Sequence, residues 1–272
     1  MGFLRRLFGQ PSAPASVPSN WAGATRQIAV KGVTFNELRD DAAVDVVGEQ
    51  YHGEVVRLFR SLSSGSGQKA VLMPEPDNRY DANAIGAYVW TAEGEVALVG
   101  YLARETAALY HPIFAYLGGK VILCDAALAP GRGGGGTDGV VLHLGTPGEL
   151  IAEVWTDDHP FRPDHAWAGK KVVFSGFGAL LSGVLLDREG QLLLARLAGC
   201  VALPRVTKKV EACIAANPNE VTTNVTKARE YGIPIIPERD FWLEVGVDEG
   251  ALGKSRGRWA QPGRAGWASG RD

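Results

Sequence analysis

The first half of the chain alternates apolar and polar residues over short segments, which is the pattern of β-strands. Runs rich in β-branched residues recur between residues 24 and 150, and Gly, Pro, Asn and Ser separate them. The segment TAEGE (91–95) predicts a hairpin between two of these runs. The segment ARETAALYHPIFAYLGG (103–119) instead has helical spacing up to Gly118, with Pro112 predicted to split it into two short turns. This pattern predicts a compact β-barrel or a strongly curved sheet with one helix.

Residues 168–246 show a different order, in which short apolar segments alternate with segments of helical spacing. Four strands are predicted, in KKVVFSGF, CVAL, VEACIAAN and IPIIP. Three helices are predicted, in REGQLLLARLAG, TTNVTKAREYG and ERDFWLEVG. Strands and helices that alternate with such short links predict a small parallel sheet flanked by helices.

The remaining segments show neither the alternation of strands nor the spacing of helices. Residues 1–23 contain the run GQPSAPASVPSN and are predicted to be a flexible N-terminal segment. Residues 151–167 carry acidic and His side chains around Pro160 and Pro163, and the prolines break any helix that would align these side chains as metal ligands. We therefore interpret 151–167 as a solvated linker. Residues 247–272 are predicted to be a disordered basic tail.

The composition limits the chemistry that we expect. The 272 residues have a formal net charge of −2, so any contact with nucleic acid has to come from a local patch. Cys124, Cys200 and Cys213 form no CxxC zinc motif, and we expect neither a metal nor a cofactor. No apolar run approaches the ~18 residues of a membrane span, so we expect no membrane partner and a cytoplasmic location.

No complete phosphate-loop motif is found in the sequence, and the single GxSxG spacing, GKSRG (253–257), lies in the segment predicted to be disordered, without the strand and helix that a nucleophile motif needs on either side. Glu75, Asp77 and Asp81 form one acidic cluster, which suggests a Mg²⁺-dependent nuclease as a weaker alternative. Two-metal sites need carboxylates that converge from several strands, and here a single segment supplies them. We therefore expect that the chain is not an enzyme.

The segment LMPEPDNRYDANAI (72–85) concentrates polar side chains at one predicted turn. Asn and Asp stabilise turns by bonding nearby backbone groups, so a purely structural role is one interpretation. However, the segments VVGEQYHGEVV, PEPDNRYDANAI and VALVGYLARETA occur in this order and together resemble the HIRAN domain, over about residues 44–120. The resemblance implies a small OB-like β-barrel and DNA binding, because the family includes a module that binds the 3′ end of single-stranded DNA.

The resemblance also implies which residues bind DNA. They are Tyr51, Asn78, Tyr80, Asp81, Tyr101 and Arg104. The rings of Tyr51 and Tyr80 would stack on an unpaired base, and Asp81 would accept a hydrogen bond from the free 3′-hydroxyl. Asn78 would contact the base or sugar, and Arg104 a phosphate.

Two positions depart from the family pattern. Gln50 stands where a relative carries Arg, and Tyr101 stands where a relative carries His. The predicted site therefore keeps its rings and its carboxylate but loses a cation.

Residues 169–246 resemble a BRCT domain, most closely the module at the end of bacterial NAD-dependent DNA ligases. The segments that carry this resemblance are GKKVVFSGF, LAGCV, VTKKVEACIAANPN and TKAREYGIPIIPERDFW, in which Trp242 stands at a core position of the family. Many BRCT domains hold one phosphate at positions that match Ser175, Gly176 and Lys227. That phosphate would belong to a phosphopeptide or to a DNA 5′ end. Alternatively, Ser175 only caps a helix and Lys227 is a surface residue.

Together these features predict a non-catalytic DNA-binding accessory protein of DNA repair or replication, associated with the nucleoid. Its fold class would be an α+β OB-like β-barrel followed by an α/β four-stranded parallel sheet with flanking helices. The HIRAN-like domain (24–150) would bind single-stranded DNA or a DNA 3′ end. The BRCT-like domain (168–246) would bind a phosphate or a repair protein of unknown identity. The alternative is a protein–protein interaction adaptor with no direct DNA binding.

Overall fold

The computed structural model describes residues 25–27, 32–34, 43–62, 68–92, 95–129, 139–162, 164–176 and 178–254. The segment 1–23 and the predicted tail from residue 255 onward lie outside the described residues. The chain divides into two compact units, one within residues 1–107 and 119–144, the other within residues 108–118 and 145–272. Among the described residues, no helix is both long and apolar enough to cross a membrane.

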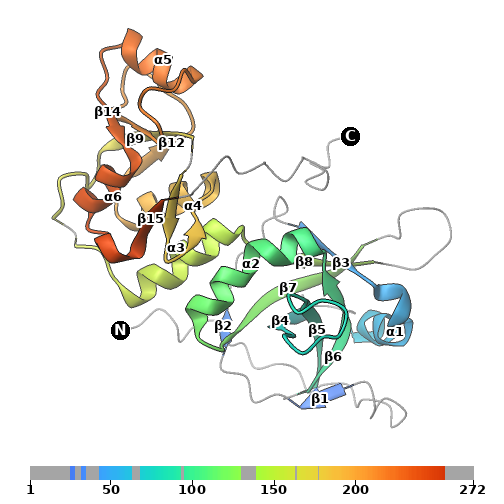
Figure 1. The fold of residues 1–272 in the computed structure, drawn as a ribbon. Helices are drawn as coiled ribbons and strands as arrows, with labels where there is room; N and C mark the ends of the chain where they lie inside the picture. Colours follow the sequence, from blue (N-terminus) through green and yellow to red (C-terminus); the bar gives the residue numbers. More distant parts are fainter. Residues whose placement is uncertain are drawn as a thin grey trace. The chain divides into compact units, whose positions relative to one another are not determined.

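A closed antiparallel β-barrel forms the first unit (Figure 1). Its six strands are β3 (Ala43–Val47), β4 (Gln68–Pro74), β5 (Ile85–Ala92), β6 (Glu95–Leu102), β7 (Val121–Ala129) and β8 (Gly139–His143). They pair in the order β6-β3-β8-β7-β4-β5, and β5 pairs with β6 to close the ring. Two further strands extend the sheet: β1 (Thr25–Gln27) pairs antiparallel with β6, and β2 (Gly32–Thr34) pairs parallel with β7. The barrel confirms the predicted fold class, and the predicted hairpin joins β5 to β6.

Side chains at alternate positions of the strands point into the barrel and fill its interior. In β7, Ile122 and Cys124 are fully buried, as expected for side chains that point to the same face of a strand. At the closure of the ring, β6 approaches β3 at Gly100. A Cβ atom there would lie 2.5 Å from both Val46 Cγ1 and the Val47 carbonyl oxygen, so only glycine fits without displacing β3.

A short 3-10 helix, η3 (Glu49–Tyr51), and helix α1 (Gly53–Leu62) connect β3 to β4. Val55, Val56 and Phe59 are buried on one side of α1, and this side packs against β5 and β6. The polar residues of η3 and the start of α1 are thereby held beside the barrel.

Helix α2 (Arg104–Leu117) runs continuously through Pro112, where the sequence predicted two short turns. That prediction was wrong. Proline lacks the N–H that would bond to the carbonyl four residues earlier. Tyr110 and Ile113 on either side are buried, and their packing keeps this part helical. The helix ends before Gly118, as predicted.

In the second unit, helix α3 (Pro147–Asp158) occupies the segment where the sequence predicted the start of a linker. Thr146 and Glu149 form a capping box: Thr146 Oγ1 accepts a hydrogen bond from Glu149 N at 3.2 Å, and the Glu149 carboxylate accepts one from Thr146 N at 3.0 Å. Trp155 is buried on this helix. The linker prediction is therefore wrong for residues 151–158, because the prolines follow the helix and do not interrupt it.

The predicted four-stranded parallel sheet with flanking helices is present in the second unit (Figure 1). In sheet order, the strands are β12 (Val201–Leu203), β9 (Lys171–Ser175), β13 (Ala212–Ala215) and β14 (Ile235–Pro237). The helices are α4 (Arg188–Leu197), α5 (Thr223–Glu230) and α6 (Glu238–Val245). This arrangement is consistent with a BRCT-like fold.

Aromatic side chains form part of the core between this sheet and α6. Trp242 is fully buried, and its ring stacks on the ring of Phe174 with centroids 5.5 Å apart. Phe241 meets both rings edge-on. The core position predicted for Trp242 is confirmed.

A small antiparallel sheet also belongs to this unit. It consists of β11 (Val184–Leu185), β10 (Ala179–Leu181) and β15 (Leu252–Lys254), and η4 (Glu249–Ala251) precedes β15. Leu252 is buried and pairs with Leu181. The prediction of disorder from residue 247 is therefore wrong up to residue 254, because β10 supplies β15 with a partner strand.

Candidate nucleic-acid interface

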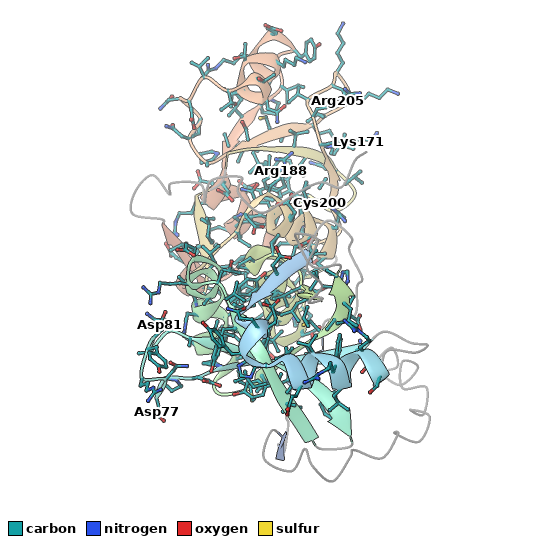
Figure 2. The ribbon with its side chains drawn as sticks, turned by 90° about the vertical axis from the view of Figure 1, so that its right-hand side faces the viewer. Asp77, Asp81, Lys171, Arg188, Cys200 and Arg205 are labelled. Atoms are coloured by element: carbon teal, nitrogen blue, oxygen red, sulfur yellow. The ribbon has the colours of Figure 1, made fainter. Side chains whose placement is uncertain are left out.

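The polar corner predicted from residues 72–85 is a tight loop between β4 and β5. Its backbone is closed by hydrogen bonds from Glu75 N to Ala84 O at 2.9 Å, from Asn78 N to Glu75 O at 3.0 Å and from Ala84 N to Asp81 O at 2.9 Å. Figure 2 shows Asp77 and Asp81 on this loop at the edge of the unit. The loop, residues 75–84, is called the corner loop below.

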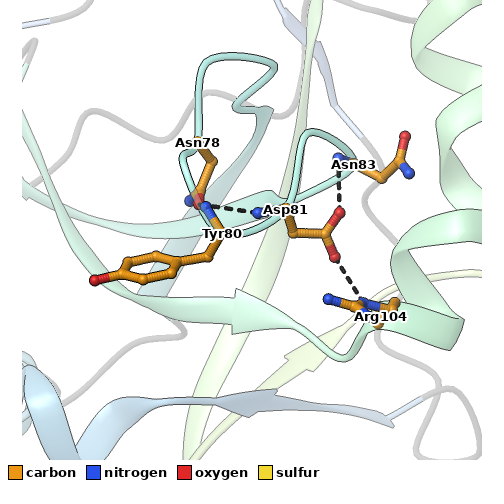
Figure 3. Close-up of polar contacts among 5 residues, drawn as sticks. All are labelled: Asn78, Tyr80, Asp81, Asn83 and Arg104. Atoms are coloured by element: carbon orange, nitrogen blue, oxygen red, sulfur yellow. Dashed lines mark hydrogen bonds and ion pairs between the residues drawn. The ribbon is translucent and has the colours of Figure 1, made fainter.

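Side chains of the corner loop also bond its own backbone (Figure 3). Asn78 Oδ1 accepts a hydrogen bond from Tyr80 N at 3.0 Å, and Asp81 Oδ1 accepts one from Asn83 N at 2.9 Å. Asn78 Nδ2 donates to Glu75 Oε2 at 3.2 Å. The turn chemistry that the sequence offered as a structural interpretation is therefore present, and its hydrogen bonds stabilise the loop.

Asp81 also pairs with Arg104, the first residue of α2. Arg104 Nε lies 2.9 Å from Asp81 Oδ2, and Figure 3 shows the carboxylate directed from the loop toward that helix. The Arg104 side chain is 73% exposed, and that of Asp81 is 23% exposed. The structure therefore brings together Asp81, the predicted acceptor of the 3′-hydroxyl, and Arg104, the residue predicted to bind a phosphate, as an ion pair at the surface.

Glu75 is the first residue of the corner loop, and its carboxylate receives hydrogen bonds from several side chains. Its two carboxylate oxygens accept from the hydroxyl of Tyr88 and, at 3.1 Å, from the hydroxyl of Tyr101. At the adjacent Gly86, a Cβ atom would lie 2.6 Å from the Tyr88 ring and 3.0 Å from Glu75 Oε1. Tyr101 thus reaches the site but is directed at Glu75, whose supporting role the sequence reasoning missed.

The two predicted stacking rings are open to solvent. Tyr51 is 82% exposed and Tyr80 is 77% exposed, which is unusual for side chains of this size. Tyr51 is the last residue of η3, and its neighbour His52 lies close enough to Glu75 to interact electrostatically. Burial lowers the pKa of His52, and the negative charge of Glu75 opposes this shift. Both rings are thus accessible, and η3 lies near the corner loop.

A comparison with known protein families matches the HIRAN domain over residues 41–123. The chain contains a HIRAN domain. The match covers β3 to the start of β7, with both predicted stacking rings and the corner loop, and it amounts to less than half of the chain. No curated protein and no solved structure matches the chain. A HIRAN domain is consistent with binding to DNA.

Arg79 of the HIRAN domain is a further candidate that the sequence reasoning missed. Its guanidinium carbon lies 4.5 Å from the centroid of the Tyr80 ring, and a terminal nitrogen donates a hydrogen bond to the Tyr80 hydroxyl. The sequence signal was available, because Arg79 is the basic residue within the DNRYD motif.

Among the residues that the structure describes, no group of three or more His, Cys, Asp or Glu side chains is arranged to hold a metal ion.

The phosphate-binding residues predicted for the second unit differ in accessibility. Ser175 is buried at the end of β9, and its hydroxyl lies 2.5 Å from Thr222 Oγ1, the cap of α5. Gly176 is exposed and has a φ of 71°, a conformation that favours glycine. Lys227 is exposed in the last turn of α5. Ser175 therefore contacts the start of α5, while Gly176 and Lys227 face solvent.

The loop after Ser175 is also held from inside the unit by Glu238. This buried carboxylate accepts hydrogen bonds from Gly178 N at 3.0 Å, from Ala179 N at 3.2 Å and from Gln191 Nε2 at 2.7 Å. Burial raises the pKa of Glu238, and these hydrogen bonds oppose the shift. Two backbone N–H groups of the loop are thus occupied by an internal carboxyl group.

Proposed function

We propose that this chain is a non-catalytic DNA-binding accessory protein of DNA repair or replication, and that its HIRAN domain recognises the 3′ end of single-stranded DNA. The observation that supports this most strongly is the exposure of Tyr51 and of Tyr80, which belongs to the hydrogen-bonded corner loop. An exposed aromatic ring stacks on an unpaired base, and each such contact contributes about 1–3 kcal/mol.

Asp81 provides the chemistry for selecting an end. A carboxylate has about four lone-pair sites, and Asn83 N and Arg104 Nε each engage one of its two oxygens. An oxygen that already accepts one hydrogen bond can accept another, here from a 3′-hydroxyl. A 3′-phosphate at the same place would bring negative charge against the carboxylate. The site should therefore prefer a free 3′-hydroxyl over a 3′-phosphate.

The test compares two 5′-labelled oligonucleotides that differ only at the 3′ end, one with a hydroxyl and one with a phosphate. Fluorescence anisotropy should show that the wild-type chain binds the hydroxyl form more tightly, by about tenfold, because a hydrogen bond to a charged group contributes about 1.5–3 kcal/mol. Asp81→Ala should abolish the difference. Asp77→Ala is the matched control, since Asp77 is an exposed acid of the same loop, and it should retain the preference.

In the second unit, we propose a contact with a protein partner or with a phosphate, through Gly176 and Lys227. Both residues are exposed, Gly176 directly after the inner strand β9 and Lys227 on α5, and this exposure supports the role. Ser175 would act indirectly, because its hydroxyl is bonded to Thr222. Lys227→Ala should weaken binding to a 5′-phosphorylated oligonucleotide or to a copurifying protein, and unchanged binding of both would count against the proposal.

The adaptor alternative is favoured by one observation, namely that Asn78 and Asp81 are already bonded within the HIRAN domain. An adaptor would bind neither oligonucleotide and would retain a protein partner on purification. The same binding experiment thus separates the two functions.

A further inference from the structure

Arg79 and Tyr80 form a preassembled surface pair on the corner loop. The Arg79 guanidinium lies over the ring of Tyr80, 4.5 Å from its centroid, and bonds to its hydroxyl. Both residues are exposed. Since the guanidinium covers one face of the ring, a nucleobase has the opposite face on which to stack.

The two arginines at this site differ in the charge of their partners. Arg104 is paired with the Asp81 carboxylate at 2.9 Å, so a phosphate that approaches Arg104 also approaches a negative charge. Among the described residues, the partner of Arg79 is the uncharged Tyr80. Within the part of the chain that the structure describes, no ion pair therefore offsets the positive charge of Arg79.

We propose that Arg79 is the phosphate-binding cation of this site, and that Arg104 mainly holds Asp81 in position. This inference rests on the proposed binding of single-stranded DNA. The ligand of Arg79 is the phosphate next to the base that stacks on Tyr80. A guanidinium suits this task because it is planar, stacks on a ring and still offers paired N–H donors to a phosphate, which an ammonium group does not do.

Binding of a 5′-labelled single-stranded oligonucleotide with a free 3′-hydroxyl, measured at several salt concentrations, tests the proposal. Arg79→Ala should weaken binding by about tenfold and reduce the slope of log affinity against log salt by about 0.7, the value for one phosphate of a single strand. Arg79→Lys should keep the slope, because it keeps the charge, but should bind a few fold more weakly than wild type. Lys120→Ala is the matched control, because Lys120 is an exposed cation beyond the far end of α2, and it should behave as wild type.

A double-mutant cycle with Tyr80→Ala then tests whether the pair acts together. If Tyr80 positions Arg79, Arg79→Ala should cost less affinity in the Tyr80→Ala background than in wild type. Wild-type affinity and an unchanged salt slope for Arg79→Ala would overturn the role of Arg79 while leaving the proposed function intact. A wild-type chain that binds no oligonucleotide would overturn both.

Discussion

Replacing Asp187 with Asn would test a carboxyl group that holds the starts of two helices in the second unit. Asp187 is the N-cap of α4 and accepts a hydrogen bond from Gly190 N at 2.9 Å. It also accepts hydrogen bonds from Thr146 Oγ1 at 3.0 Å and from Gly148 N at 3.4 Å, at the start of α3. An Asn side chain has nearly the same shape and its carbonyl oxygen can still cap α4, but it carries no charge.

Burial raises the pKa of the Asp187 carboxyl from 3.8 to about 6, and its hydrogen bonds oppose the shift. Between these two values the folded state binds more protons than the unfolded state, so the free energy of unfolding rises as the pH falls through this window. The contribution of Asp187 is complete below the unfolded pKa and is lost as the pH rises through the folded pKa. One pKa unit corresponds to about 1.4 kcal/mol, and the carboxyl therefore adds roughly 1.3 kcal/mol at pH 5 relative to pH 7.

When the pH is lowered from 7 to 5, we expect the free energy of unfolding of wild type to rise by this amount relative to that of Asp187→Asn. Urea unfolding followed by the fluorescence of the buried Trp155 and Trp242 measures the gain, and exchange of the α4 amide hydrogens assigns it to this unit. Burial also raises the pKa of Glu238, but this residue is present in both proteins, so its contribution to the pH dependence cancels in the comparison. Asp240→Asn, at an exposed acid of the same unit, should keep the wild-type pH dependence. If wild type and Asp187→Asn show the same pH dependence, the reasoning is refuted.

Two further substitutions test close contacts in the two units. Gly190→Ala would place a Cβ atom 2.4 Å from the Gly148 carbonyl carbon, so the starts of α3 and α4 would have to separate. We expect the free energy of unfolding to fall by about 1–3 kcal/mol, measured in a thermal melt. Gly250→Ala, where no atom lies within 4 Å of the added Cβ, should change it little. Glu75→Gln removes the negative charge that opposes the shift of His52, so the pKa of His52 should fall further in an NMR titration. An unchanged pKa of His52 would contradict the placement of η3 near the corner loop.

The sheet and helices of the second unit were predictable because each element carries its own local signals. The strands are short apolar runs, and Thr222 and Gly246 lie at the ends of α5 and α6. Helix α3 was not predicted, because Asp157 and Asp158 at its end and the prolines Pro160 and Pro163 after it were interpreted as a solvated linker. Its signal was nevertheless local: Thr146 and Glu149 are spaced as a capping box before an apolar stretch. Strand β15 had no comparable signal, since three residues are too few to show a period and the pairing with β10 is set by the tertiary fold.

At the candidate site, the sequence suggested candidate residues but did not predict which side chains they contact. The corner loop was predictable from its Asn, Asp and Pro residues, since their turn chemistry is local. The contact of Asp81 with Arg104 and that of Tyr101 with Glu75 join segments far apart in the chain. Such contacts depend on how β6 and α2 pack, and residue types alone do not specify them.

Turn formation and the proposed ligand binding are compatible at this corner, because the side chains of Arg79 and Tyr80 would serve binding alone, although Asp81 would serve both. Asn78 and Asp81 bond back to the loop or to α2, while Arg79 and Tyr80 project to solvent. The first pair fixes the loop before any ligand arrives, so the second pair loses less conformational freedom on binding. Loss of Asp81 would therefore both loosen the loop and remove the acceptor for a 3′-hydroxyl. A looser loop would weaken the binding of both oligonucleotides to the same extent, whereas loss of the acceptor would change the ratio of their two affinities. The ratio of affinities therefore shows whether the Asp81 carboxylate only supports the loop or also binds the 3′-hydroxyl.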